Sequence, residues 1–71
     1  MRPVYHVLAK RWAHGWELHI DGVGVTQARW PGEAERMARS LIEINDDVPP
    51  DSFDLTWSTE SPDPDFLAAV A

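Results

Sequence analysis

The stretch "GWELHIDGVGVTQARW", residues 15–30, decides the fold of this chain. In "GWELHID" the apolar residues Trp16, Leu18 and Ile20 alternate with polar ones, which predicts a half-buried strand. Two glycines, at 22 and 24, then bracket a tight reversal, because glycine adopts the positive φ that such turns can need. The run "VTQA", residues 25–28, follows as a short strand. The two glycines do not form a phosphate loop, since the third glycine and the lysine of that motif are absent.

The preceding residues "VYHVLAKRW", 4–12, alternate in the same way and predict the first arm of a hairpin. A loop at residues 12–15 places Arg11 opposite Trp16 and fixes the register. Apolar pairs then share one face and polar pairs the other: Ala9–Leu18 and Val7–Ile20, against Lys10–Glu17 and His6–Asp21. A slip of one residue would bury Glu17 and His19, so only this register satisfies both faces.

Residues 31–45, "PGEAERMARSLIEIN", predict a helix. Apolar residues recur at helical spacing and form one stripe, with Asn45 at its end: Ala34, Met37, Ala38, Leu41 and Ile42. Pro31 suits the first turn, where a missing N–H costs nothing. The helix ends at "NDDVPP", residues 45–50, which contains turn formers and prolines.

A last strand is predicted in "SFDLTWS", residues 52–58, with Phe53, Leu55 and Trp57 on one face. A strand reached through a crossover helix usually returns parallel and right-handed. We therefore expect an α+β fold: a four-stranded sheet in order 3-2-1-4, chain order β-β-β-α-β, with one helix packed on one face. Residues 1–58 would form this domain and residues 59–71 an acidic flexible tail, whose last six residues either dock as a helical turn or fray.

The 71 residues contain no cysteine and four tryptophans. A chain of this size buries only about 60 % of its unfolded surface, so we expect self-association to support it as a homo-oligomer. It has no apolar run long enough to span a membrane and no signal peptide at its start. These features predict a soluble cytoplasmic protein without membrane contact.

The net charge of −6 is unevenly distributed. Residues 1–39 contain all six bases and four acids, whereas residues 40–71 contain eight acids and no base. An acidic half of this kind repels nucleic acid and attracts a basic partner. The alternative is a solvated face that only keeps the protein soluble.

The sequence contains little evidence for a catalytic function. The serines lie in no recognisable nucleophile elbow, and the first strand offers no acid for a two-metal nuclease site. His6 and His19 share one face of the hairpin, where Asp21 or Asp54 could complete a metal site. More often, such histidines are half-exposed strand residues. We therefore expect no enzymatic activity, no cofactor and no metal.

Aromatic residues at predicted loops and strand ends are the better candidates for partner binding, because they are enriched at interface hot spots. Together with the acids of the second half, the candidates are Trp12, Trp30, Trp57, Asp54, Glu60, Asp63 and Asp65. In the alternative interpretation Trp30 staples the start of the helix and Trp57 caps the core.

The order of several short motifs resembles the HicB-like antitoxin family. The resemblance covers residues 4–58 and rests on these elements: Tyr5, Val7, Ala9, Gly15-Trp16, Gly22-Val23-Gly24 with Thr26 and Gln27, and Ala34-Glu35. It implies a reduced RNase H-like fold that lacks the catalytic acids. Many members add a C-terminal DNA-binding domain, but about a dozen residues after the last strand are too few for one, so no direct DNA binding is expected.

The resemblance also implies a role. Such antitoxins neutralise a small basic mRNA-cleaving toxin, called HicA, through protein–protein contact. The first hypothesis is therefore an antitoxin-like protein whose acidic half covers a HicA-like toxin. The alternative is a stand-alone homo-oligomeric structural or regulatory domain without a toxin partner, with its aromatic residues packed between subunits.

Overall fold

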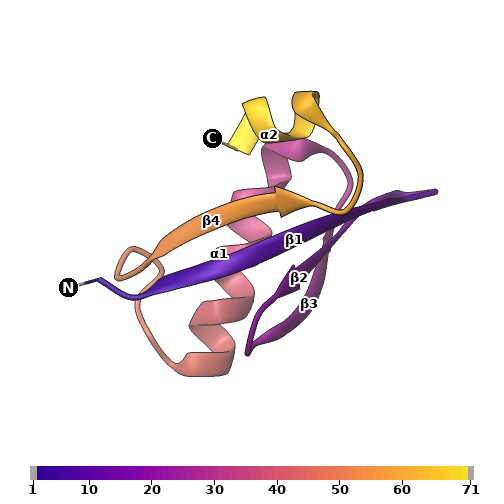
Figure 1. Ribbon diagram of the computed structural model, residues 1–71. Coiled ribbons are helices and arrows are strands. Elements are labelled where there is room, and N and C mark those ends of the chain that lie inside the picture. The colour runs from indigo at the N-terminus through magenta and orange to yellow at the C-terminus, as the bar shows by residue number, and fades with distance from the viewer. Residues whose placement is uncertain (1, 71) are drawn as a thin grey trace.

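The computed structural model describes residues 2–70, which form one four-stranded sheet and two helices. The elements are β1 (Val4–Trp12), β2 (Gly15–Ile20), β3 (Gly24–Ala28), α1 (Pro31–Asp46), β4 (Asp54–Thr59) and α2 (Pro64–Val70). The strand order is β3-β2-β1-β4, and β4 runs parallel to β1 while the other neighbours are antiparallel. Both helices lie on the same side of the sheet (Figure 1). The predicted α+β class and strand order are confirmed.

The hairpin register is also confirmed, with Ala9 opposite Leu18 and Arg11 opposite Trp16. The strands extend one pair further than expected, because Trp12 pairs with Gly15 and only two residues form the turn. Lys10 lies opposite Glu17 across the hairpin, as expected, but its ammonium group forms an ion pair with a different acid. Lys10 contacts Glu60, which follows β4, with 3.4 Å between Nζ and Oε2.

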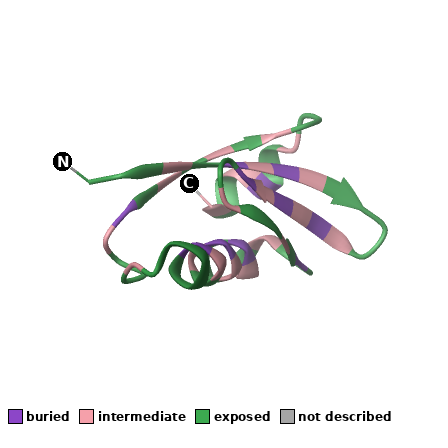
Figure 2. Ribbon diagram, turned by 90° about the horizontal axis from the view of Figure 1, so that it is seen from below, coloured by how far each residue is buried: buried purple, intermediate pink, exposed green. Residues whose placement is uncertain are grey.

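The core lies between one face of the sheet and α1. The helix buries Ala34, Ala38 and Ile42, as its apolar stripe predicts, against alternate residues of β1 and β2. Figure 2 shows buried positions alternating with partly buried ones along the strands. The fully buried Phe53, just before β4, closes the core beside Tyr5. Within residues 2–70, no helix has the length and apolar character needed to cross a membrane.

The segment expected to be a flexible tail contains the second helix, α2. Its Phe66 is fully buried, and its ring packs 5.5 Å from that of Trp16 and 5.9 Å from that of Trp57. Asp63 caps the helix by accepting a hydrogen bond from the Phe66 N–H. The chain therefore has two helices over the sheet instead of one, and the core continues beyond residue 58.

Asp63 also joins α2 to the sheet, and this predicts a pH dependence. It accepts a hydrogen bond from the Trp16 indole at 3.0 Å. This bond, the Phe66 N–H and the charge of Arg11 lower the pKa of Asp63 below its ordinary 3.8. Because the pKa is lower in the folded state, the stabilisation is complete above about pH 4 and is lost as the pH falls through the folded value. In Asp63→Asn, we expect stability to fall less steeply with acid than in the wild type, measured by urea unfolding between about pH 6 and pH 2. Equal slopes for the two proteins would contradict this.

Candidate functional site

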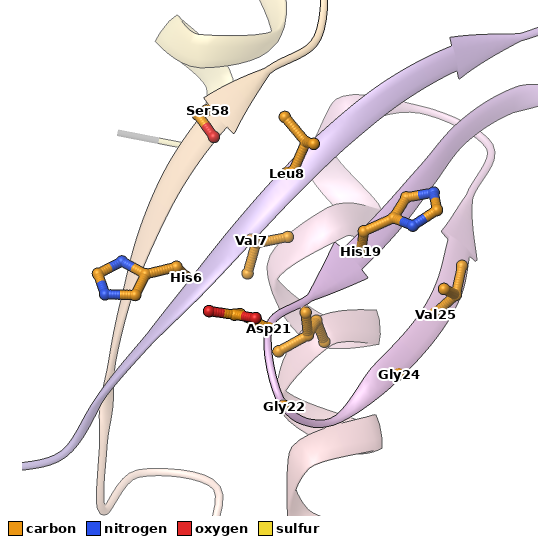
Figure 3. A pocket seen from close by; sticks show the side chains of 10 residues that line it. His6, Val7, Leu8, His19, Asp21, Gly22, Gly24, Val25 and Ser58 are labelled. Atoms are coloured by element: carbon orange, nitrogen blue, oxygen red, sulfur yellow. The ribbon is translucent and has the colours of Figure 1, made fainter.

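The face of the sheet opposite the helices is open. It carries a shallow hollow of about 490 Å³, whose lining includes His6, Leu8, His19, Val25 and Ser58. Figure 3 shows that these side chains come from all four strands of the sheet. The surface mixes apolar and polar groups, and much of it is exposed to water.

The two histidines on this face contact different neighbours. Their rings point in opposite directions (Figure 3), and each has a protein partner. His6 Nδ1 hydrogen bonds to the Thr56 hydroxyl, and His19 Nε2 lies 3.1 Å from Glu17 Oε1. Among residues 2–70, no three His, Cys, Asp or Glu side chains are grouped closely enough to hold a metal ion. His6 is exposed and His19 is half-buried, and they lie on adjacent strands.

The three candidate tryptophans occupy two different environments. Trp12 and Trp30 are 38 % and 55 % exposed and lie at the hairpin end and the start of α1. Trp57 is half-buried and packs edge-on against Phe66, so it belongs to the core, as the alternative interpretation proposed. Trp30 is the N-cap residue of α1 but makes no side-chain capping bond. Two of the three rings are therefore accessible to a partner.

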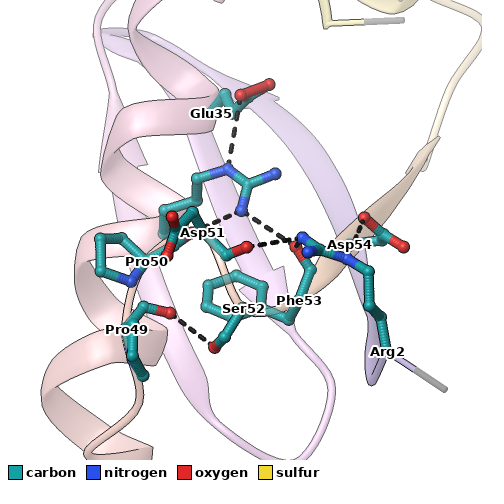
Figure 4. A network of polar contacts seen from close by, with 9 residues as sticks. Arg2, Glu35, Pro49, Pro50, Asp51, Ser52, Phe53 and Asp54 are labelled. Atoms are coloured by element: carbon teal, nitrogen blue, oxygen red, sulfur yellow. Dashed lines mark hydrogen bonds and ion pairs between the residues drawn. The ribbon is translucent and has the colours of Figure 1, made fainter.

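Asp54 is occupied by an intramolecular contact. Two arginines hold the segment before β4 between α1 and the N-terminal strand (Figure 4). Arg2 pairs with Asp54 at 3.2 Å and donates to the Asp51 and Phe53 carbonyls, and Arg39 donates to the Pro50 and Phe53 carbonyls. Asp54 thus helps to fix this segment, which reduces the negative charge it offers to a partner.

The other three acidic candidates lie toward α2. Glu60 pairs with Lys10, and Asp63 is bonded to Trp16 and the Phe66 N–H. Asp65 lies exposed in the first turn of α2, where a negative charge favours the helix dipole. Most of the acids that the sequence suggested for partner binding are thus engaged within the chain.

A more exposed acidic surface lies at the C-terminal end of α1, and we call Glu43, Ile44, Asp46 and Asp47 the acidic end. All four residues are exposed, and Ile44 is 77 % exposed. No described residue forms an ion pair with any of the three carboxylates. Sequence reasoning missed Ile44, although its position off the apolar stripe and between acids was a usable signal.

Asp46 of the acidic end has two hydrogen-bond donors close by. Asp46 accepts a hydrogen bond from the Tyr5 hydroxyl and another from Asn45. The Tyr5 hydrogen bond, followed by that of Asn45, lowers the pKa of Asp46, and the same contact with Asp46 raises the pKa of Tyr5. The carboxylate is therefore held in its ionised form beside the helix end.

No known family model matches the sequence, and neither a curated protein nor a solved structure matches the chain.

Proposed function

We propose that this protein is an antitoxin-like binding domain, which acts in the cytoplasm and neutralises a small basic mRNA-cleaving (HicA-like) toxin through protein–protein contact. The acidic end would cover the basic surface of the toxin. The proposal assigns no catalytic role and no cofactor to this chain. It is supported by the electrostatics of α1 and by the motifs that resemble HicB-like antitoxins.

The unrelieved negative charge at the end of α1 carries the proposal. A helix has a partial negative charge at its C-terminus, which basic residues normally offset. The last turn of α1 contains no base, and Glu43, Asp46 and Asp47 add further negative charge there. The acids and the negative end of α1 therefore repel each other, which costs some stability. A cationic partner would relieve this repulsion.

Ile44 gives this surface an apolar centre. Fully exposing a large aliphatic side chain offers no benefit to the isolated domain, whereas burial in an interface releases about 1.5–3 kcal/mol. Charged residues around an apolar centre are typical of interfaces, in which the rim supplies specificity and association rate. Ile44 with its acidic neighbours therefore suits a basic protein better than a small ligand.

The order β-β-β-α-β is the one that the resemblance implied, and it supports the relationship without depending on any single motif. We propose that the sheet with α1 corresponds to the reduced RNase H-like domain of that family. α2 is an addition to this pattern, since it covers Trp16 and Trp57 on the helix side.

The test is co-expression with the product of the adjacent open reading frame. We expect that product alone to stop colony growth, and this protein to restore growth by forming a complex that is weaker in about 0.5 M than in about 0.1 M salt. In Ile44→Lys we expect both rescue and complex formation to be lost, because the substitution places a cation in the centre of the contact.

Val25→Lys is the matched control, since Val25 is also an exposed apolar residue, 53 % accessible, but lies on the open sheet face. It should rescue growth as the wild type does. A harmless neighbour, or rescue that Ile44→Lys leaves intact, would reject the proposed function of the acidic end.

A further inference from the structure

The opposite end of α1 carries a basic and aromatic surface. We call Trp12, His14, Arg29, Trp30 and Arg36 the basic end. All except Trp30 line a hollow of about 470 Å³ between the hairpin turn and the first turns of α1, and Met37 and Glu33 also line it. The hollow combines aromatic rings, a thioether and two guanidinium groups with one carboxylate, which together suit an apolar side chain flanked by carboxylates.

The cations of the basic end are available to a partner. The side chains of Arg29 and Arg36 are each 73 % exposed, and both approach the same carboxylate, that of Glu33. Glu33 is only 9 % exposed and also accepts a hydrogen bond from the Arg29 N–H. One partly buried acid thus faces two exposed arginines, so the surface keeps a positive charge while the chain as a whole is at −6.

The aromatic rings of the basic end are preorganised. The Arg29 guanidinium lies 5.0 Å from the Trp30 ring centre, and the Trp12 and His14 rings meet edge-on at 5.0 Å. Such contacts restrict the rotamers of the free protein, so less entropy is lost on binding.

This chain itself carries a surface group that would fit the hollow of the basic end. The acidic end offers an exposed isoleucine, 77 % accessible, with carboxylates on either side. However, Trp30 and Ile44 lie near opposite termini of α1, a 16-residue helix that is about 24 Å long. Ile44 therefore cannot reach the hollow of the basic end within one copy.

We propose that the basic end binds the acidic end of a second copy of this chain. The contact joins two different surfaces, so it is heterologous, and each copy keeps one free end of each kind. Self-association then builds chains or closes into a ring. A basic partner that occupies the acidic end would compete with this contact.

Charge reversal at each end tests the proposal. Arg29→Glu alters the basic end and Glu43→Lys the acidic end, and both side chains are exposed. We expect each variant alone to associate at least about tenfold more weakly than the wild type, because like charges then face each other. Mixing the two variants should restore association, since the intact ends of each can meet. Sedimentation velocity over a concentration series, in low and high salt, measures this directly.

Ser58 and Ser61 provide the charge-matched controls, because both are exposed and neither lines the hollow of the basic end. Changing both to Asp, or both to Lys, gives the same shifts in net charge and should leave self-association unchanged. A wild type that stays monomeric at all concentrations overturns the proposal. So does a mixture that remains dissociated, which would indicate a symmetric interface or none. Arg29→Glu leaves the acidic end intact, so the rescue experiment with this variant separates a failure of self-association from a failure of the proposed function.

Discussion

Replacement of Phe66 by alanine is expected to remove much of the stability of this protein. The side chain is fully buried and contacts both Trp16 and Trp57. Truncation of a buried phenylalanine typically costs about 3–5 kcal/mol. A 71-residue domain has a total stability of only about 4–10 kcal/mol. We therefore expect Phe66→Ala to be largely unfolded at moderate urea concentrations where the wild type is folded, as measured by tryptophan fluorescence.

The matched control is Val70→Ala in the same helix, because Val70 is only half-buried. Val70→Ala should lower the free energy of unfolding by about 1 kcal/mol. If both substitutions had the same small effect, α2 would not be docked on the core, and the expectation of a flexible tail would be restored.

The hairpin and the strand order could be predicted from the sequence because two independent patterns agree on them. Alternation along residues 4–12 and 15–20 admits one register, and a slip would have buried Glu17 and His19. The crossover rule then places the last strand beside the first. These are local or topological constraints, which is why a cross-strand pair such as Ala9–Leu18 could be predicted correctly from the alternation alone.

The second helix was predicted only as one of two alternatives, a docked turn of helix in the last six residues, and the same reasoning could not choose between them. Seven residues are too few for a helical periodicity to emerge, and two Pro-Asp steps are typical of a linker. The space that Phe66 fills exists only once Trp16 and Trp57 are placed in the folded sheet. The capping signal was nevertheless in the sequence, since Asp63 lies three residues before Phe66.

The candidate site was predicted in part. The charge asymmetry identified the acidic half, but not which acids are engaged within the chain. Glu60 reaches Lys10 because β4 lies parallel to β1 and ends beside it. Asp54 meets Arg2, 52 residues earlier in the chain. Such pairings depend on the folded backbone, so composition alone cannot separate an engaged carboxylate from one available to a partner.

The substitution Gly15→Ala is expected to disrupt the sheet more than any other change at a glycine. Gly15 has φ +136°, and a Cβ there would lie 2.2 Å from the Ala28 carbonyl oxygen and 2.9 Å from the Arg29 Cα. Both atoms belong to the backbone at the end of β3, so neither can move without shifting the strand. Backbone strain and the forced displacement together should cost about 3–5 kcal/mol.

Gly22→Ala separates the two contributions, because Gly22 also has a positive φ, +74°, but open space where a Cβ would lie. That substitution should cost only the left-handed strain, about 1–2 kcal/mol. Urea unfolding of the two variants side by side measures the difference. If Gly15→Ala were no more destabilising than Gly22→Ala, β3 would have to move away from the hairpin at little cost. Because Ala28 and Arg29 lead directly into α1, that result would also mean that the hollow of the basic end is not rigidly held.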